Sequence, residues 1–331
     1  MNVLVTGAAG FIGSHLVDHL LAKQHCVTGL DNLRNGSLQN LSGALQNHAF
    51  RFIQGDILNP EDCLKACTDT HTIYHLACLG VRHSLHDPFE NHRVNAEGTL
   101  RILEAAKACG VRRFFYISTS EVYGKTDSFP IRETSLTAPT TVYGASKLAG
   151  EHYTLAFLEA CGLAATVFRI FNNYGPRAHF EGDAGEMIPR SIIRLLNGLP
   201  PIVFGNGTVT RDFFYVQDTA RVLHDFISRD DAVGRTINVG TGEEITMRAL
   251  AERLSEIITS GNIPVQYLED RPADVPRLWV DNSLLKSLYQ LDSLMPFASG
   301  LQHTVNYYRQ LGPAESLLQK IAVRNWTAEK A

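Results

Sequence analysis

The sequence predicts an α/β protein with a doubly wound parallel sheet and a smaller mixed α/β domain on its C-terminal side. Three observations lead to this fold class. Short β-branched or aromatic runs alternate with longer helical patterns, the first run leads directly into a glycine-rich turn, and the alternation ends near residue 170. Alternation of this kind is typical of βαβ units, in which helices cover both faces of a parallel sheet.

The first half of the chain supplies the sheet. Strands are expected at 2–5, 27–30, 50–53, 72–75, 113–117 and 165–169, and helices at 12–23, 60–66, 88–108 and 142–160. The 331 residues, of which 44% are hydrophobic and 19% charged, suffice for one large globular domain or two closely joined ones.

The second half changes character after a turn cluster at 172–176. It predicts a helix at 187–196, strands at 202–204 and 211–216, a helix from 217, a strand at 236–239 and a helix at 246–259. We therefore divide the chain into a sheet domain (1–170), a mainly substrate-binding cap (171–312) with some segments that return to the sheet domain, and a C-terminal tail (313–331). The tail is expected to form a terminal helix without chemistry.

Composition excludes several classes of function. The net charge of -4 and the lack of a Lys or Arg run argue against a nucleic-acid partner. No stretch approaches the roughly 20 apolar residues that span a bilayer, and the N-terminus lacks the features of a secretory signal. The six cysteines show no paired metal spacing, so we expect structural thiols, a cytoplasmic protein and no metal.

The turn after the first strand has the features of a dinucleotide-binding loop. Gly7, Gly10 and Gly13 permit a tight turn, a close approach of backbone to a pyrophosphate and close packing of the following helix. The N–H groups at the start of that helix favour a phosphate anion. Asp31 lies 18 residues past Gly13, after the second strand, where it would bond a ribose hydroxyl and repel a 2′-phosphate. This favours NAD over NADP, although Arg34 is close enough to weaken the preference.

Tyr143 and Lys147 form the expected catalytic pair. Four positions apart on a predicted helix, their side chains share one face. The Lys147 ammonium should lower the tyrosine pKa from about 10 and make the phenol a usable base near neutral pH.

A hydroxyl-rich segment follows the strand at 113–117. Ser118–Gly124 (STSEVYG) lies where open α/β sheets place their ligands, at the carboxyl end of a strand. Thr119 or Ser120 can bond a substrate hydroxyl there, and Glu121 can move a proton at a neighbouring carbon.

Taken together, these motifs resemble the extended short-chain dehydrogenase/reductase superfamily, and within it the NAD-dependent nucleotide-sugar epimerases, dehydratases and decarboxylases. The similarity also includes the segments 75–77 (HLA), 172–177 (NNYGPR) and 210–216 (TRDFFYV), and covers residues 1–258. It implies a Rossmann-type fold with NAD as cofactor. With Tyr143 and Lys147, the expected NAD contacts are Gly7, Gly10, Phe11, Ile12, Gly13, Asp31, Asn32, Asp56, Ile57, Leu76 and Ala77.

The resemblance also implies roles at the substrate. Thr119 would bond the sugar 4-OH, and Tyr143 would take its proton while the C4 hydride passes to NAD. Lys147 would hold the nicotinamide ribose, Asn172 and Arg211 the diphosphate, and residues 199–203 the base, with UDP favoured. Helices 88–108 and 142–160 would form a homodimer interface.

The members of this family share a 4-keto sugar intermediate and differ in the step after it. Glu121 favours an enzyme that works at C5, and the triplet 119–121 (TSE) resembles UDP-glucuronate decarboxylases. Segment 80–84, which holds Arg82 and Ser84, is similar to one in UDP-glucuronate 4-epimerases, and Arg82 or Arg177 could pair with a C6 carboxylate. UDP-glucuronate decarboxylase is therefore the first choice.

Three alternatives stay open: a 4,6-dehydratase, a UDP-sugar 4-epimerase and, from another class, a non-catalytic NAD-binding regulator. The segment 143–147 (YGASK) lacks the Gly-Lys-Arg ending typical of UDP-xylose synthases. The segment 179–186 (HFEGDAGE) matches no known specificity.

Overall fold

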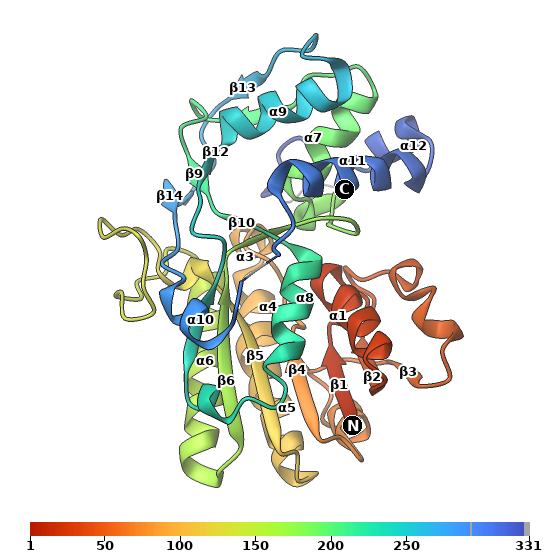
Figure 1. Ribbon diagram of the computed structural model, residues 1–331, viewed down its shortest axis with the longest axis vertical. Coiled ribbons are helices and arrows are strands. Elements are labelled where there is room, and N and C mark those ends of the chain that lie inside the picture. Colours follow the sequence, from red (N-terminus) through yellow and green to blue (C-terminus); the bar gives the residue numbers. More distant parts are fainter. Residues whose placement is uncertain (292, 328–331) are drawn as a thin grey trace.

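The central sheet explains how the site is assembled. A computed structural model describes residues 1–291 and 293–327 of the chain. Seven strands form the sheet in the order β11-β6-β5-β4-β1-β2-β3, and neighbouring strands pair in parallel (Figure 1). The strands are β1 (Asn2–Thr6), β2 (Cys26–Asp31), β3 (Phe50–Gln54), β4 (Thr72–His75), β5 (Arg113–Thr119), β6 (Ala164–Ile170) and β11 (Thr236–Val239). The expected doubly wound parallel sheet is confirmed.

Helices cover both faces of this sheet because its strands are apolar on both sides. In β1, Val3 and Val5 pack in one core cluster, with residues of α1 (Phe11–Ala22) and α8 (Val216–Asp225). Leu4, between them, belongs to the opposite cluster, with α2 (Pro60–Cys67), α5 (Gly98–Ala108) and α6 (Val142–Cys161). The alternation follows from the two-residue repeat of a strand.

The helix expected at 88–108 is more complex than predicted. It begins as α4 (Pro88–His92), passes through a π-helical turn at Arg93–Glu97 and continues as α5. Asn95, in the π turn, accepts a hydrogen bond from Leu79 N at 2.8 Å and donates one to Leu79 O at 3.0 Å. The turn therefore anchors the loop that follows β4, which also carries the short helix α3 (His83–His86).

The cap lies beyond the carboxyl ends of the sheet strands (Figure 1). Its helices are α7 (Met187–Leu196), α9 (Met247–Thr259) and α11 (Phe297–Leu311), which share one core. The tail adds α12 (Ala314–Leu318), whose Leu317 joins this core. Three small sheets pair β7 (Asn172–Tyr174) with β10 (Phe213–Tyr215), β8 (Ile202–Phe204) with β13 (Gln266–Leu268), and β9 (Thr210–Arg211) with β12 (Ile245–Thr246) and β14 (Arg277–Leu278). Helix α10 (Ser283–Leu288) packs against β11.

Two segments of the second half differ from expectation. The strand predicted at 211–216 is divided into β9 and β10 at Asp212, whose carboxylate accepts hydrogen bonds from Thr241 N and Gly242 N. The C-terminal tail forms α12 and then reaches the 179–186 segment, where Asn325 donates to the carbonyls of Gly182 and Gly185. Across the described residues, no helix has the length and apolar character needed to cross a bilayer.

Candidate active site

A cavity of about 470 Å³ lies between the carboxyl ends of the strands and the cap. Loops after β1, β2, β3, β4 and β5 form one wall, and segments around β7, α7, β8 and β9 form the other. Most residues singled out from the sequence line it: Gly7, Gly10, Phe11, Ile12, Gly13, Asp31, Asn32, Asp56, Ile57, Leu76, Ala77, Arg82, Thr119, Ser120, Glu121, Tyr143, Lys147, Asn172 and Arg211.

The glycine loop has the shape that a pyrophosphate needs. Gly7 has a φ of +69°, and a Cβ there would lie 2.9 Å from Ala77 N. A Cβ at Gly13 would lie 2.0 Å from Gly7 O, so only glycine lets α1 pack this close to the loop. Gly10 caps α1 without a side-chain hydrogen bond, which leaves N–H groups of its first turn available to an anion.

Asp31 is held at the end of β2 by its own loop. Oδ2 accepts from Ala9 N at 2.9 Å and Oδ1 from Leu33 N at 2.8 Å. Burial raises the pKa of this carboxyl, while the hydrogen bonds from Leu33 and Ala9 oppose the rise. Each oxygen keeps a further lone pair, so the carboxylate can still accept from a ribose hydroxyl.

Arg34 lines the cavity, but its charge is paired with a carboxylate. Its guanidinium forms an ion pair with Glu90, in which Nη2 donates to Oε2 at 2.8 Å. The same nitrogen lies 3.3 Å from His83 Nε2. The structure therefore places the guanidinium against α4, where Glu90 offsets its charge.

Tyr143 and Lys147 project from the first turns of α6, whose N-cap is Thr141. The Lys147 ammonium donates to the carbonyl oxygen of Ile117 at 2.6 Å and lies 4.4 Å from the centre of the Tyr116 ring. Burial lowers the pKa of Lys147.

The pKa of Tyr143 differs from the sequence-based expectation. Burial, followed by the nearby Cys78 thiol, holds the pKa of the phenol above its ordinary value, and a hydrogen bond with Thr119 opposes the rise. The net pKa is therefore raised rather than lowered as the sequence had predicted, because desolvation of the phenolate is the largest effect.

Glu121 lies beside this pair in a 3₁₀ turn that begins after β5. Its N–H donates to Thr119 Oγ1 at 3.2 Å, and a Cβ at Gly144 would lie 2.7 Å from Glu121 O. The turn thus packs directly on the start of α6. Burial raises the pKa of the Glu121 carboxyl, although Arg211 and Arg271 act against it. A raised pKa makes a carboxylate a stronger proton acceptor, which suits general acid–base catalysis.

Two arginines share one carboxylate on the cap side of the cavity. Arg211 Nη2 and Arg271 Nη2 each donate to Asp274 Oδ1 at 2.7 Å. This leaves excess positive charge, which suits a diphosphate. The Asn172 Oδ1 atom is buried and has no hydrogen-bond partner among the described residues. Arg271 was missed by the sequence reading, since it stands in a loop beyond the segment that carried the resemblance.

Two expected substrate contacts lie elsewhere. Arg177 donates from Nη1 to Asp18 Oδ2 at 2.7 Å and does not line the cavity. Ser84 is buried and donates to Val81 O at 2.7 Å, also away from the cavity. Both side chains have partners within the protein, and the structure does not bring them to the cavity.

Arg82 lines the cavity but is already engaged. Its Nε donates to Asp183 O at 2.7 Å, and Nη2 donates to Ala184 O at 3.0 Å and to Glu186 Oε1 at 2.7 Å. The guanidinium therefore holds the segment 179–186, and its charge is offset by Glu186.

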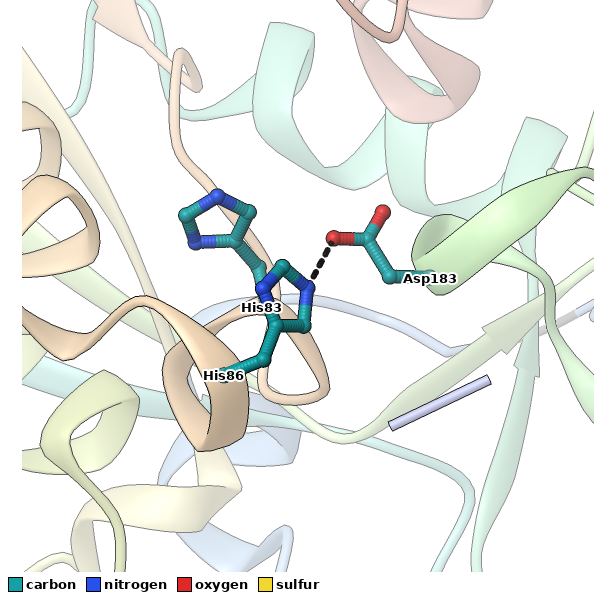
Figure 2. Close-up of side chains that lie close together, drawn as sticks. All are labelled: His83, His86 and Asp183. Carbon is teal, nitrogen blue, oxygen red and sulfur yellow. Dashed lines mark hydrogen bonds and ion pairs between the residues drawn. The ribbon is translucent and has the colours of Figure 1, made fainter. Parts of the chain in front are cut away.

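A second contact holds the same segment (Figure 2). His86 Nε2 lies 2.9 Å from Asp183 Oδ2, and His83 lies beside them. Imidazole and carboxylate groups could hold a metal ion, and atoms of these three side chains lie within 4.8 Å of one another. The Arg34 guanidinium, 3.3 Å from His83 Nε2, places a fixed positive charge at the cluster. We therefore interpret it as a polar contact between α3 and the cap.

Comparison with known proteins agrees with the geometry. A sequence model described as the NAD dependent epimerase/dehydratase family matches residues 3–240. The chain is 35% identical to UDP-glucose 4-epimerase of Mycolicibacterium smegmatis, over 93% of this chain and 99% of that protein. It is 30% identical to UDP-glucuronic acid decarboxylase 1 of Xenopus tropicalis, over 93% and 72%. The dTDP-glucose 4,6-dehydratase DesIV of Streptomyces venezuelae, solved with NAD, superposes with a TM-score of 0.87 at 31% identity, covering 93% of this chain and 97% of DesIV.

Proposed function

The chain belongs to the NAD-dependent epimerase/dehydratase family, and from this premise we propose that it converts a neutral nucleotide-sugar by 4,6-dehydration. The arrangement of Thr119, Glu121 and Tyr143 around one cavity above the glycine loop carries the proposal. This arrangement combines groups for oxidation at C4 with an acid–base group suited to C5.

The glycine loop and Asp31 would hold NAD. The open N–H groups at the start of α1 would bind the pyrophosphate, and Asp31 would accept a hydrogen bond from the adenosine ribose. Asn32 donates to Asp56 Oδ2 at 3.0 Å, so these two side chains and Ile57 would border the adenine. When bound, NAD supplies the acceptor for the C4 hydride.

Oxidation at C4 requires removal of the hydroxyl proton as the hydride leaves. Thr119 would accept or donate a hydrogen bond at the 4-OH, and Tyr143 would take its proton. Because burial raises the pKa of Tyr143, the phenolate form requires positive charge nearby. Lys147, one turn along α6, would supply this charge in its protonated form and would also bond the nicotinamide ribose.

The ketone at C4 then acidifies the proton on C5. Glu121 would take this proton and return it to the departing C6 hydroxyl, so that water leaves and a C5–C6 double bond forms. Addition of the hydride taken from C4 to C6, and of a proton to C5, would then give a 4-keto-6-deoxy sugar. A simple 4-epimerase needs no acid or base at C5, which is why Glu121 favours elimination.

The structure weakens the argument for UDP-glucuronate as the substrate. Arg177 is paired with Asp18, and Arg82 is paired with Glu186, so neither is free of a carboxylate partner. Decarboxylation of UDP-glucuronate, the first choice from sequence, becomes the second candidate. The TSE triplet at 119–121 and the similarity to the Xenopus decarboxylase favour it.

Product analysis separates these reactions. The purified protein and NAD are incubated with one nucleotide-sugar at a time: UDP-glucose, UDP-N-acetylglucosamine, dTDP-glucose, GDP-mannose or UDP-glucuronate. The product masses are measured by mass spectrometry. Loss of one water from a neutral sugar supports the proposal. Loss of carbon dioxide from UDP-glucuronate establishes the decarboxylase, and an isomer of unchanged mass establishes an epimerase. Absence of any conversion would favour a non-catalytic NAD-binding protein.

A further inference from the structure

The segment His179–Glu186, which we call the strap, forms part of the cavity wall between β7 and α7. His179, Ala184, Gly185 and Glu186 line the cavity. The strap closes on itself through Glu186 N, which donates to His179 O at 2.7 Å. From the sheet side, Arg82 and His86 bind it, and from the other side Asn325 binds its carbonyls. Its position is therefore defined from both sides.

Glu186 is the strap residue that presents a charge to the cavity. Oε1 accepts from Arg82, whereas Oε2 has no hydrogen-bond partner within the described part of the chain. The Glu186 side chain lines the cavity and is 44% exposed. Burial pushes the pKa of the Glu186 carboxyl upward, but the charge and hydrogen bond of Arg82 outweigh it and the net pKa is lowered. The group is therefore a carboxylate at neutral pH.

The surroundings of Glu186 indicate which part of a nucleotide-sugar it would meet. A diphosphate carries negative charge and would avoid a carboxylate, and the paired guanidinium groups of Arg211 and Arg271 provide a better position for it. Burial is the main reason for the raised pKa of Tyr143, but the charges of Glu121 and Glu186 add to it, so both carboxylates are near the phenol. The charge of Arg271 acts on Glu186 in turn, which puts Glu186 between the phenol and the paired arginines, where the sugar of a nucleotide-sugar would lie.

We propose that Glu186 determines substrate specificity: its free Oε2 accepts a hydrogen bond from a hydroxyl or amide N–H of the sugar, and its charge excludes sugars that carry a carboxylate. This deepens the proposed function and rests on it. Like charges brought together in an enclosed site repel strongly, because little water screens them. Arg82 does not reverse this selection, since it is paired with Glu186 and with two strap carbonyls.

The test measures binding of paired ligands to the NAD-loaded Tyr143→Phe variant, in which turnover is blocked. UDP-glucose and UDP-glucuronate differ at C6, and UDP alone reports on the nucleotide site. We expect UDP-glucose to bind about tenfold or more tightly than UDP-glucuronate. Glu186→Gln keeps the shape of the side chain and removes its charge. Added to Tyr143→Phe, it should reduce the ratio of UDP-glucose affinity to UDP-glucuronate affinity about tenfold, mainly because UDP-glucuronate binds more tightly. The affinity for UDP should stay unchanged.

Asp183→Asn is the matched control, because it alters the strap's contact with His86 without changing the charge that faces the cavity. In the Tyr143→Phe background, Asp183→Asn should leave the ratio of UDP-glucose affinity to UDP-glucuronate affinity unchanged. Equal or tighter binding of UDP-glucuronate before Glu186 is changed, or an unchanged ratio in Glu186→Gln, would overturn the proposal. If UDP itself fails to bind, the UDP assignment is wrong, and dTDP-glucose and dTDP-glucuronate replace the pair. Because these ratios require no turnover, they can fail or hold separately from the proposed dehydration.

Discussion

Lys147 Nζ lies 2.6 Å from the carbonyl oxygen of Ile117, and this hydrogen bond ties the catalytic helix α6 to the end of β5. Two residues after Ile117 comes Thr119, which lines the cavity with Tyr143 and acts to lower the pKa of its phenol. The lysine therefore helps to hold the hydroxyl-bearing turn and the tyrosine together, in addition to the charge that it brings.

Removal of the Tyr143 hydroxyl should abolish most activity. We expect Tyr143→Phe to lower turnover about 100- to 10,000-fold, since general-base catalysis contributes gains of this size. NAD affinity, measured by fluorescence titration, should stay nearly unchanged because the glycine loop and Asp31 are untouched. A variant with turnover close to that of the unchanged protein would rule out Tyr143 as the base.

Glu121 should act after the first hydride transfer. In Glu121→Gln, C4 oxidation can still occur, so NADH absorbance should rise and persist while the final product forms much more slowly. Rapid mixing with the substrate identified by mass spectrometry measures both signals. Product formation at the original rate would show that no group at C5 is needed and would return a simple epimerase to first place.

Asp31 should determine the preference for NAD. Loss of a hydrogen bond to a charged group costs about 1.5–3 kcal/mol, so Asp31→Ala should weaken NAD binding roughly 10- to 100-fold. The affinity for NADP should rise relative to the affinity for NAD, because Asp31 no longer repels the 2′-phosphate. Glu90→Gln is an informative companion, as it releases Arg34 and should favour NADP further. An equal loss of affinity for NAD and NADP in Asp31→Ala would show that Asp31 does not discriminate between the two cofactors.

His15 should make stability depend on pH. Its Nε2 lies 2.9 Å from Pro176 O, and burial lowers its pKa from 6.5 to about 4. A histidine with a lowered pKa contributes stability that is present above 6.5 and is lost as the pH falls toward 4. We expect the melting temperature of the original protein to fall over this pH range. The melting temperature of His15→Gln, which keeps a donor for Pro176 O, should fall less steeply. Parallel curves for the two proteins would show that His15 does not contribute.

The helices α4, α5 and α6 expose apolar side chains that a second copy could cover. Phe89 is 81% exposed, Val142 38% and Leu100 36%. Together with the family resemblance, this predicts a homodimer in sedimentation experiments. Leu100→Glu should shift the protein toward monomer by placing charge on the α5 face. Sedimentation of the original protein as a monomer at all concentrations would remove the dimer prediction.

The sequence by itself determined the order of strands and helices in residues 1–170, the glycine loop and the spacing of Tyr143 and Lys147. These features depend on local geometry: the two-residue repeat of a strand, the turn of a helix and the room that a missing Cβ leaves. For that reason the strand at 72–75 and the helix at 187–196 were predicted with the bounds that the structure shows.

Only the tertiary structure decided which charges face the ligand. Arg177 pairs with a residue 159 positions away and Arg82 with one 104 positions away, and no local pattern predicts such partners. The pKa of Tyr143 likewise follows from burial rather than from its helical neighbour Lys147. A charged side chain takes the partner that folding brings to it, so the strap carboxylate of Glu186, and the substrate preference we infer from it, became visible only when distant segments of the chain came together.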